Sequence, residues 1–348
     1  MKAYVLHGIG DLRYEDVELP VLEENTVLVR VRAAGICGSD IPRIYRTGAY
    51  SHPLIPGHEF AGVVTDAAPG VDRAWLNKRV GVFPMIPCRV CPQCRKKQYE
   101  MCQNYNYLGS RTDGGFAEYV RVPVWNLIEL PEQVSFEQAS MLEPASVAVH
   151  AARRIQTGAG ESAAVCGLGT IGLLLVMFLQ GMGVRDIYVI GNKDMQKRMA
   201  LDLGIPEERF CDTRKQDAVE WMEAATAGAG VDVFFDCVGK SRVLEEAIQC
   251  VCAGGRIMLV GNPASDVQLE KNLYWKILRR QLTLKGTWNS SYTQEAEDDW
   301  HFALNAIREG RIHPEKLITH RFALEELSRG MEAMRDKTEE YVKMTAVL

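Results

Sequence analysis

The sequence predicts an α/β protein that combines a mostly β domain with a doubly wound parallel-sheet domain. Three observations predict it: short alternating β-type runs before about Ala151, strict alternation of strand and helix after it, and a Gly-rich turn inside the alternating block. A chain of 348 residues with 47% hydrophobic composition can bury two cores.

The β-type runs come first along the chain. Typical examples are TVLVRVRAA at 26–34 and KRVGVFPMI at 78–86, and Gly and Pro turn signals separate them. The alternating block then predicts strands at SAAVC, DIYVIGN, VDVFFDCVG and GGRIMLVG, with helices at MQKRMALDLG and SRVLEEAIQCVCA. Such alternation is typical of βαβ units on a parallel sheet.

After about Gly286 the alternation stops. A helical DDWHFALNAIREG leads to a final strand, VKMTAVL, which we expect to return to the first domain. The expected division is therefore 1–152 for the β domain, 153–285 for the parallel-sheet domain, and 286–348 for the return segment.

Charge and composition exclude several classes of partner. The formal net charge of -5 and the lack of a long Lys/Arg block argue against nucleic acid and anionic membranes as partners. The N-terminus has no secretory pattern, and the longest apolar run, 171–179, is too short to cross a bilayer. We expect a cytoplasmic protein.

The Gly-rich turn follows the SAAVC strand and opens a helix, which is the context of a dinucleotide fingerprint. Gly167 allows the tight turn, Gly169 lets the backbone approach a pyrophosphate, and Gly172 lets helix and strand pack closely. The N–H groups at the helix start, around Thr170 and Ile171, then face the phosphates. The turn predicts NAD or NADP.

The end of the next strand bears on the choice between the two dinucleotides. It reads Gly191-Asn192-Lys193, without the acidic residue that accepts hydrogen bonds from the ribose of NAD. Space and positive charge favour the 2'-phosphate of NADP, with Asn192 and Lys193 as contacts. The alternative is that Lys193 is a solvated charge and that Asp194 or the backbone serves NAD.

Two sets of residues are candidate metal sites. The first has the spacing C-x2-C-x2-C-x7-C, which predicts a closed, structural zinc site with four thiolates, at Cys88, Cys91, Cys94 and Cys102. The second is dispersed and provides one thiolate, one imidazole and one or two carboxylates, enough for a catalytic zinc with an open position, at Cys37, His58, Glu59 and Glu143.

These motifs carry a family resemblance over nearly the whole chain. GICGSD at 35–40, GHEFAG at 57–62, GGFAEY at 114–119 and GLGTIG at 167–172 occur in the order found in the zinc-containing medium-chain alcohol and polyol dehydrogenases. The chain resembles this family, and within it the enzymes that act on a sugar-alcohol phosphate. Pro42 departs from the polyol members, which usually have His there.

The resemblance implies a GroES-like β domain flanking a Rossmann domain, and roles for particular residues. Cys37, His58 and Glu143 would be zinc ligands, Glu59 an alternate ligand or water holder, and Ser39 the first proton acceptor. Tyr50, Glu118, Trp288 and Asn289 are candidates to line the substrate, and Arg43, Arg46 or Lys271 could meet a phosphate. A homodimer or homotetramer is usual for such enzymes.

The expected activity is zinc-dependent oxidation of a secondary hydroxyl on a small-molecule sugar-alcohol phosphate, with NAD or NADP as hydride acceptor. An unphosphorylated polyol or sugar is the first alternative. A catalytically silent regulatory scaffold is the second, and it would be favoured by a missing ligand or relay residue.

Overall fold

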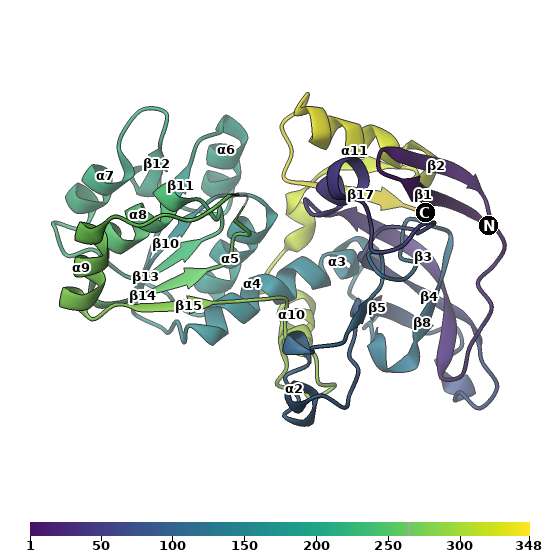
Figure 1. The fold of residues 1–348 in the computed structure, drawn as a ribbon. Helices are drawn as coiled ribbons and strands as arrows, with labels where there is room; N and C mark the ends of the chain where they lie inside the picture. Colours follow the sequence, from purple (N-terminus) through teal and green to yellow (C-terminus); the bar gives the residue numbers. More distant parts are fainter. Residues whose placement is uncertain (264) are drawn as a thin grey trace. The chain divides into compact units, whose positions relative to one another are not determined.

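The computed structural model describes residues 1–263 and 265–348, which divide into two compact units. The first unit combines Met1–Ser146 with Ser290–Leu348, and the second is Val147–Asn289. Each unit has its own strands and helices (Figure 1). Among the described residues, none of the helices has the length and apolar character needed to cross a bilayer.

The second unit is a six-stranded parallel sheet, in the order β12-β11-β10-β13-β14-β15. Strand order reverses at the central strand, because β11 and β13 lie on either side of β10, and such a switch point is where parallel sheets bind ligands. The strands are β10 (Ser162–Cys166), β11 (Asp186–Gly191), β12 (Phe210–Asp212), β13 (Val231–Asp236), β14 (Val251–Leu259) and β15 (Thr283–Gly286).

Helices connect these strands, which confirms the predicted α/β class. They are α5 (Thr170–Gly181), α6 (Asp194–Asp202), α7 (Ala218–Ala225), α8 (Ser241–Cys250) and α9 (Lys271–Arg280). One expected boundary is wrong: the helix predicted for SRVLEEAIQCVCA ends at Cys250, and its last three residues begin β14. The β-branched Val251 has an extended backbone, with ψ of 149°, so it favours the strand.

The first unit is built on a sheet in the order β16-β17-β3-β4-β5-β9, with β8 paired to β3. The last strand of the chain pairs antiparallel with β3, where Thr345 lies opposite Gly35. The strands are β3 (Thr26–Ile36), β4 (Glu59–Ala67), β5 (Arg79–Val82), β8 (Tyr119–Pro123), β9 (Leu127–Glu129), β16 (Ile318–Phe322) and β17 (Lys343–Val347).

Smaller elements complete the first unit. A hairpin and a two-residue ladder lie outside the main sheet, and several helices pack beside it. These elements are β1 (Lys2–Gly8), β2 (Asp11–Asp16), β6 (Met85–Ile86), β7 (Asn106–Tyr107), α1 (Asp40–Pro42), α2 (Pro92–Arg95), α3 (Phe136–Ser140), α10 (Asp299–Arg308) and α11 (Leu327–Asp336). Helix α4 (Leu142–Arg154) begins in the first unit and ends in the second.

Candidate active site

The pairing of β3 with β4 brings two of the predicted zinc ligands together. Gly35, near the end of β3, lies opposite Glu59, the first residue of β4. Cys37 and His58 therefore leave the sheet side by side. The ligand atoms of Cys37, His58 and Glu59 all lie within 4.8 Å of one another, and both His58 and Glu59 are buried.

Lys343 joins this group from the last strand of the chain. Its ammonium forms an ion pair with Glu59 and donates a 3.0 Å hydrogen bond to the carbonyl of Ile36. Both side chains of the pair are only 2% exposed. Burial alone would lower the pKa of Lys343, but Glu59 and Cys37 raise it above its usual value, so the residue stays charged.

A glycine makes room for this pair. A Cβ atom at Gly35 would lie 2.5 Å from Glu59 Oε2 and 2.7 Å from Lys343 Cε, which real side chains do not tolerate. Sequence analysis did not indicate Lys343, because Lys on a C-terminal strand is ordinarily an edge or surface charge, and it stands 284 residues from Glu59.

Asp40 orients the imidazole of His58. Its Oδ1 lies 3.3 Å from His58 Nδ1 and 2.6 Å from Nη1 of Arg43, and its Oδ2 accepts the N–H of Cys37 at 3.0 Å. A carboxylate behind one ring nitrogen leaves the other to face a metal. Burial alone would lower the pKa of His58, but Asp40 and Cys37 raise it well above its ordinary value.

Glu143 approaches the same group from α4. It accepts a 3.3 Å hydrogen bond from the hydroxyl of Tyr107, whose ring packs edge-on against His58 with centroids 5.8 Å apart. Its oxygens lie outside the closest cluster of ligand atoms. Burial raises the pKa of Glu143 to about 7, and the nearby His58 opposes this rise.

The donor set fits a zinc ion. One thiolate, one imidazole and carboxylates are the ligands that Zn²⁺ takes at catalytic sites. Glu143 is a buried carboxyl whose raised pKa means that it needs a nearby cation to ionise readily. The hydroxyl of Ser39 adds a polar group, because it donates to Cys37 Sγ at 3.3 Å.

The four-cysteine segment is a separate lobe whose buried cluster consists largely of the cysteines themselves. Cys91, Cys94 and Cys102 form that cluster, with Cys88, Tyr99 and Tyr105 packed against it. The four sulfurs lie within 4.8 Å of one another, and none is in a disulfide. Hydrogen bonds from backbone N–H groups lower the pKa of Cys91 to about 6, which favours a thiolate there.

The second unit builds the predicted dinucleotide turn after β10. Gly167 has φ of +93°, and a Cβ there would lie 2.6 Å from Val238 Cγ2. A Cβ at Gly172 would lie 2.1 Å from the carbonyl oxygen of Gly167, whereas Gly169, which precedes α5, faces open space. The turn borders a cavity of about 540 Å³, which is lined among others by Gly191, Asn192 and Lys240.

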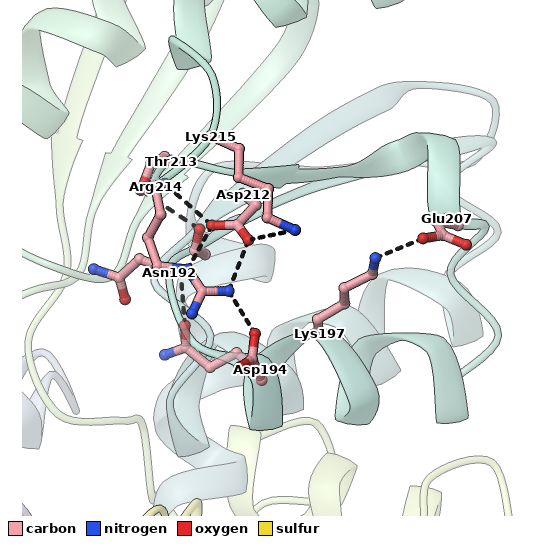
Figure 2. A network of polar contacts seen from close by, with 10 residues as sticks. Asn192, Asp194, Lys197, Glu207, Asp212, Thr213, Arg214 and Lys215 are labelled. Atoms are coloured by element: carbon pink, nitrogen blue, oxygen red, sulfur yellow. Dashed lines mark hydrogen bonds and ion pairs between the residues drawn. The ribbon is translucent and has the colours of Figure 1, made fainter.

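Beside that cavity the loop after β12 forms a network of charges (Figure 2). The N–H of Thr213 donates to the carbonyl of Gly191 at 3.0 Å, which holds this loop against the end of β11. Nε and Nη2 of Arg214 donate to the carboxylate of Asp212 at 2.9 and 2.7 Å, and Nη2 also donates to Asp194 at 2.5 Å. Lys193, in contrast, has no ion-pair partner among residues 1–263 and 265–348.

The other predicted site residues fall in different places. Tyr50 is 74% exposed and packs against Arg111, a residue that the sequence analysis did not select. Glu118 accepts the backbone N–H of Lys2 at 2.8 Å and lines a different pocket, of about 280 Å³, which includes none of the candidate zinc ligands. Trp288, Asn289 and Lys271 belong to the second unit. Trp288 and Lys271 are exposed, Asn289 is partly buried, and Lys271 begins α9.

Two family models match the chain. Residues 23–132 match an alcohol dehydrogenase GroES-like domain, and residues 170–307 match a zinc-binding dehydrogenase. Galactitol 1-phosphate 5-dehydrogenase from Escherichia coli K12 is 29% identical and covers 97% of this chain and 96% of its own. L-idonate 5-dehydrogenase from Vitis vinifera is 33% identical (92% and 87%), and sorbitol dehydrogenase from Bacillus subtilis is 29% identical (97% and 95%).

Solved structures agree over the full length. The galactitol-1-phosphate dehydrogenase from Escherichia coli superposes with a TM-score of 0.93 at 28% identity, covering 100% of both chains. A zinc-binding dehydrogenase from Sinorhizobium meliloti bound to NADP gives 0.90 at 27% (100% and 99%). An alcohol dehydrogenase from Escherichia coli CFT073 in complex with NADH gives 0.90 at 26% (100% and 99%). The chain belongs to the zinc-binding medium-chain dehydrogenases and is an alcohol or polyol dehydrogenase.

Proposed function

We propose that this enzyme oxidises a secondary hydroxyl of a sugar-alcohol phosphate, of the galactitol 1-phosphate kind, to the ketose phosphate. The observation that carries this substrate class is the full-length similarity to the galactitol-1-phosphate dehydrogenase of Escherichia coli. An unphosphorylated polyol is the second candidate, and the similarity to sorbitol dehydrogenase of Bacillus subtilis favours it.

Cys37, His58 and Glu143 would hold the catalytic zinc, with Glu59 as an alternate ligand or water holder. Bound there, zinc supplies a Lewis acid that lowers the pKa of a hydroxyl group. Asp40 would keep His58 in the right tautomer, and Lys343 would balance the charge of Glu59. Cys88, Cys91, Cys94 and Cys102 would hold a second, structural zinc.

The oxidation separates a proton from a hydride. Ser39 would accept the hydroxyl proton, a role supported by its contact with Cys37 and by the ability of a hydroxyl to accept and donate at once. The hydride would leave the same carbon for the nicotinamide ring of NAD(P), so the carbinol becomes a ketone and the dinucleotide is reduced.

The dinucleotide would bind along the turn from Gly167 to Gly172, with NADP as the favoured form. The engagement of Asp194 by Arg214 supports this preference, because Asp194 is the acid that the sequence offers after Lys193 as an acceptor for an unphosphorylated ribose. Asn192 and the unpaired Lys193 would contact the 2'-phosphate.

The test is initial rates on galactitol 1-phosphate, galactitol, sorbitol and xylitol, each with NAD and with NADP, before and after zinc removal. We expect zinc-dependent activity on the phosphorylated polyol, with a higher kcat/KM for NADP. Activity restricted to the free polyols would contradict the proposed substrate class, and a preference for NAD would contradict the proposed roles of Asn192 and Lys193.

A further inference from the structure

The cationic side chains around the candidate zinc site differ in whether a carboxylate already pairs with them. Lys343 is paired with Glu59, and Arg43 is paired with Asp40. Arg111 has no carboxylate partner in the part of the chain that the structure describes, residues 1–263 and 265–348. Its charge therefore remains available for a ligand.

The backbone of Arg111 is hydrogen-bonded to Tyr107, a residue that contacts His58. Its N–H donates to the carbonyl of Tyr107 at 2.9 Å, and Tyr107 contacts both His58 and Glu143. The loop around it packs on the residue before His58, because a Cβ at Gly109 would lie 2.3 Å from the carbonyl oxygen of Gly57. Arg111 is thus carried by a segment that has little freedom to move.

Two tyrosine rings hold the guanidinium between them. Its central carbon lies 4.2 Å from the ring centre of Tyr50 and 4.2 Å from that of Tyr105. One nitrogen, Nη1, donates to the carbonyl of Tyr105 at 3.1 Å. Stacking of this kind leaves the edge of the guanidinium available for hydrogen bonds in the plane of the group.

The edge of Arg111 formed by Nε and Nη2 has no acceptor among the residues that the structure describes. In Arg13, Arg214 and Arg335 the same two nitrogens donate hydrogen bonds to one carboxylate. In Arg111, Nε is buried without an acceptor, and Nη2 has none within the described ranges. An unpaired buried N–H is energetically unfavourable, so an acceptor from outside the chain would relieve that cost.

We propose that Arg111, held between Tyr50 and Tyr105, binds the phosphate of the substrate and so selects phosphorylated over free polyols. A phosphate presents two oxygens at the spacing of the Nε and Nη2 donors, which is why Arg binds it bidentately. The exposed ring of Tyr50 must shift for the anion to reach Nε. This inference rests on the proposed function, because it assigns the anionic end of that substrate.

The test compares Arg111→Gln, Arg111→Lys and a matched control, Arg335→Gln, in the zinc-loaded full-length enzyme. Arg335 also stacks on a tyrosine, Tyr45, but its Nε and Nη2 atoms already donate to the carboxylate of Asp336. We expect Arg111→Gln to lower kcat/KM for galactitol 1-phosphate about 100-fold, mostly through KM, because it removes a charge-assisted bidentate pair. Arg111→Lys should recover part of the loss, since it restores the charge without the fork.

Two further measurements separate the possible failures. Inhibition of galactitol oxidation by inorganic phosphate should weaken in Arg111→Gln and remain in Arg335→Gln. If the unmodified enzyme shows no preference for the phosphorylated polyol, the proposed function fails and this inference falls with it. If the preference exists and Arg111→Gln retains it, the inference alone is wrong. Zinc content and melting temperature check that each variant is folded.

Discussion

The ion pair between Lys343 and Glu59 is the most deeply buried charge arrangement beside the candidate zinc ligands. Each side chain is 2% exposed, and the lysine also donates to the carbonyl of Ile36. Taking two charges out of water is costly, so such pairs persist where their geometry is good and other charges lie nearby. Here the Cys37 sulfur and Glu143 add negative charge around the one lysine.

Replacing Lys343 by Met should destabilise the enzyme strongly. The change leaves Glu59 buried without its partner, which typically costs about 3–5 kcal/mol. We expect a lower melting temperature in both forms, with a larger drop in zinc-stripped protein, because zinc supplies further positive charge beside Glu59 in the loaded form. The measurement is thermal unfolding followed by circular dichroism.

A surface pair provides the control for this substitution. Lys78 and Glu129 are also ion-paired across the same sheet, but are 43% and 55% exposed. Exposed pairs contribute about 0–1 kcal/mol, so Lys78→Met should leave the melting temperature nearly unchanged. Equal shifts in melting temperature in the two variants would show that the buried Lys343 pair stabilises the enzyme no more than the exposed pair does.

Residues that act through local spacing were predictable, and residues that act through the fold were not. The four cysteines and the glycines of the turn are close in sequence, so their spacing alone indicates their geometry. Lys343 reaches Glu59 only because β17 and β4 both pair with β3, and Tyr107 meets His58 beside a loop that packs on Gly57. No periodicity encodes such contacts.

Glu118 likewise makes a contact that depends on the fold and not on local spacing. It lies in a family motif, and its sequence position suggested a place near the substrate, whereas its carboxylate accepts the backbone N–H of Lys2. That contact joins residues 116 positions apart, at a point where the chain's second residue needs an acceptor. The sequence shows the carboxylate, but only the fold shows which donor it meets.

At the scale of elements, α5 depends on one glycine for its contact with β10. A Cβ at Gly172 would lie 2.1 Å from the carbonyl oxygen of Gly167, a backbone atom that cannot turn away. Gly172→Ala should therefore destabilise the protein by about 1–3 kcal/mol, as overpacking does. It should also weaken NADPH binding, measured by fluorescence titration, since the phosphate turn must shift.

Another glycine of the same helix gives the matched control. Gly181 ends α5, is exposed, and has open space where a Cβ would be added. Gly181→Ala should leave NADPH affinity unchanged and preserve or slightly raise stability, because Ala favours helix over Gly. Loss of affinity in both variants would point to the helix as a whole and would contradict the role given to Gly172.

The four-cysteine lobe is an element without a conventional apolar core, so its order should depend on its metal. Cys94→Ser should reduce bound zinc from about two ions per chain to about one, measured by elemental analysis, because a closed structural site needs all four thiolates. Cys252→Ser is the control, since that cysteine lies in neither cluster. Retention of two zinc ions in Cys94→Ser would refute a four-thiolate site.

At the scale of the whole molecule, metal and dinucleotide chemistry are divided between the two units. Both candidate zinc clusters belong to the first unit, and the Gly-rich turn with its cavity belongs to the second. A ligand stabilises the part of a protein that binds it, by about 2.7 kcal/mol at a hundred times its Kd. Zinc and NADPH should therefore act on different parts of the unfolding profile.

Scanning calorimetry of the full chain tests this division. Chelation of zinc should lower the transition of the first unit and leave the second in place, while NADPH should raise the second even in zinc-stripped protein. Chelator saturated with zinc beforehand controls for effects of the reagent itself. If chelation lowered both transitions equally, the units would unfold as one, and the metals would stabilise the Rossmann sheet as much as the domain that carries their ligands.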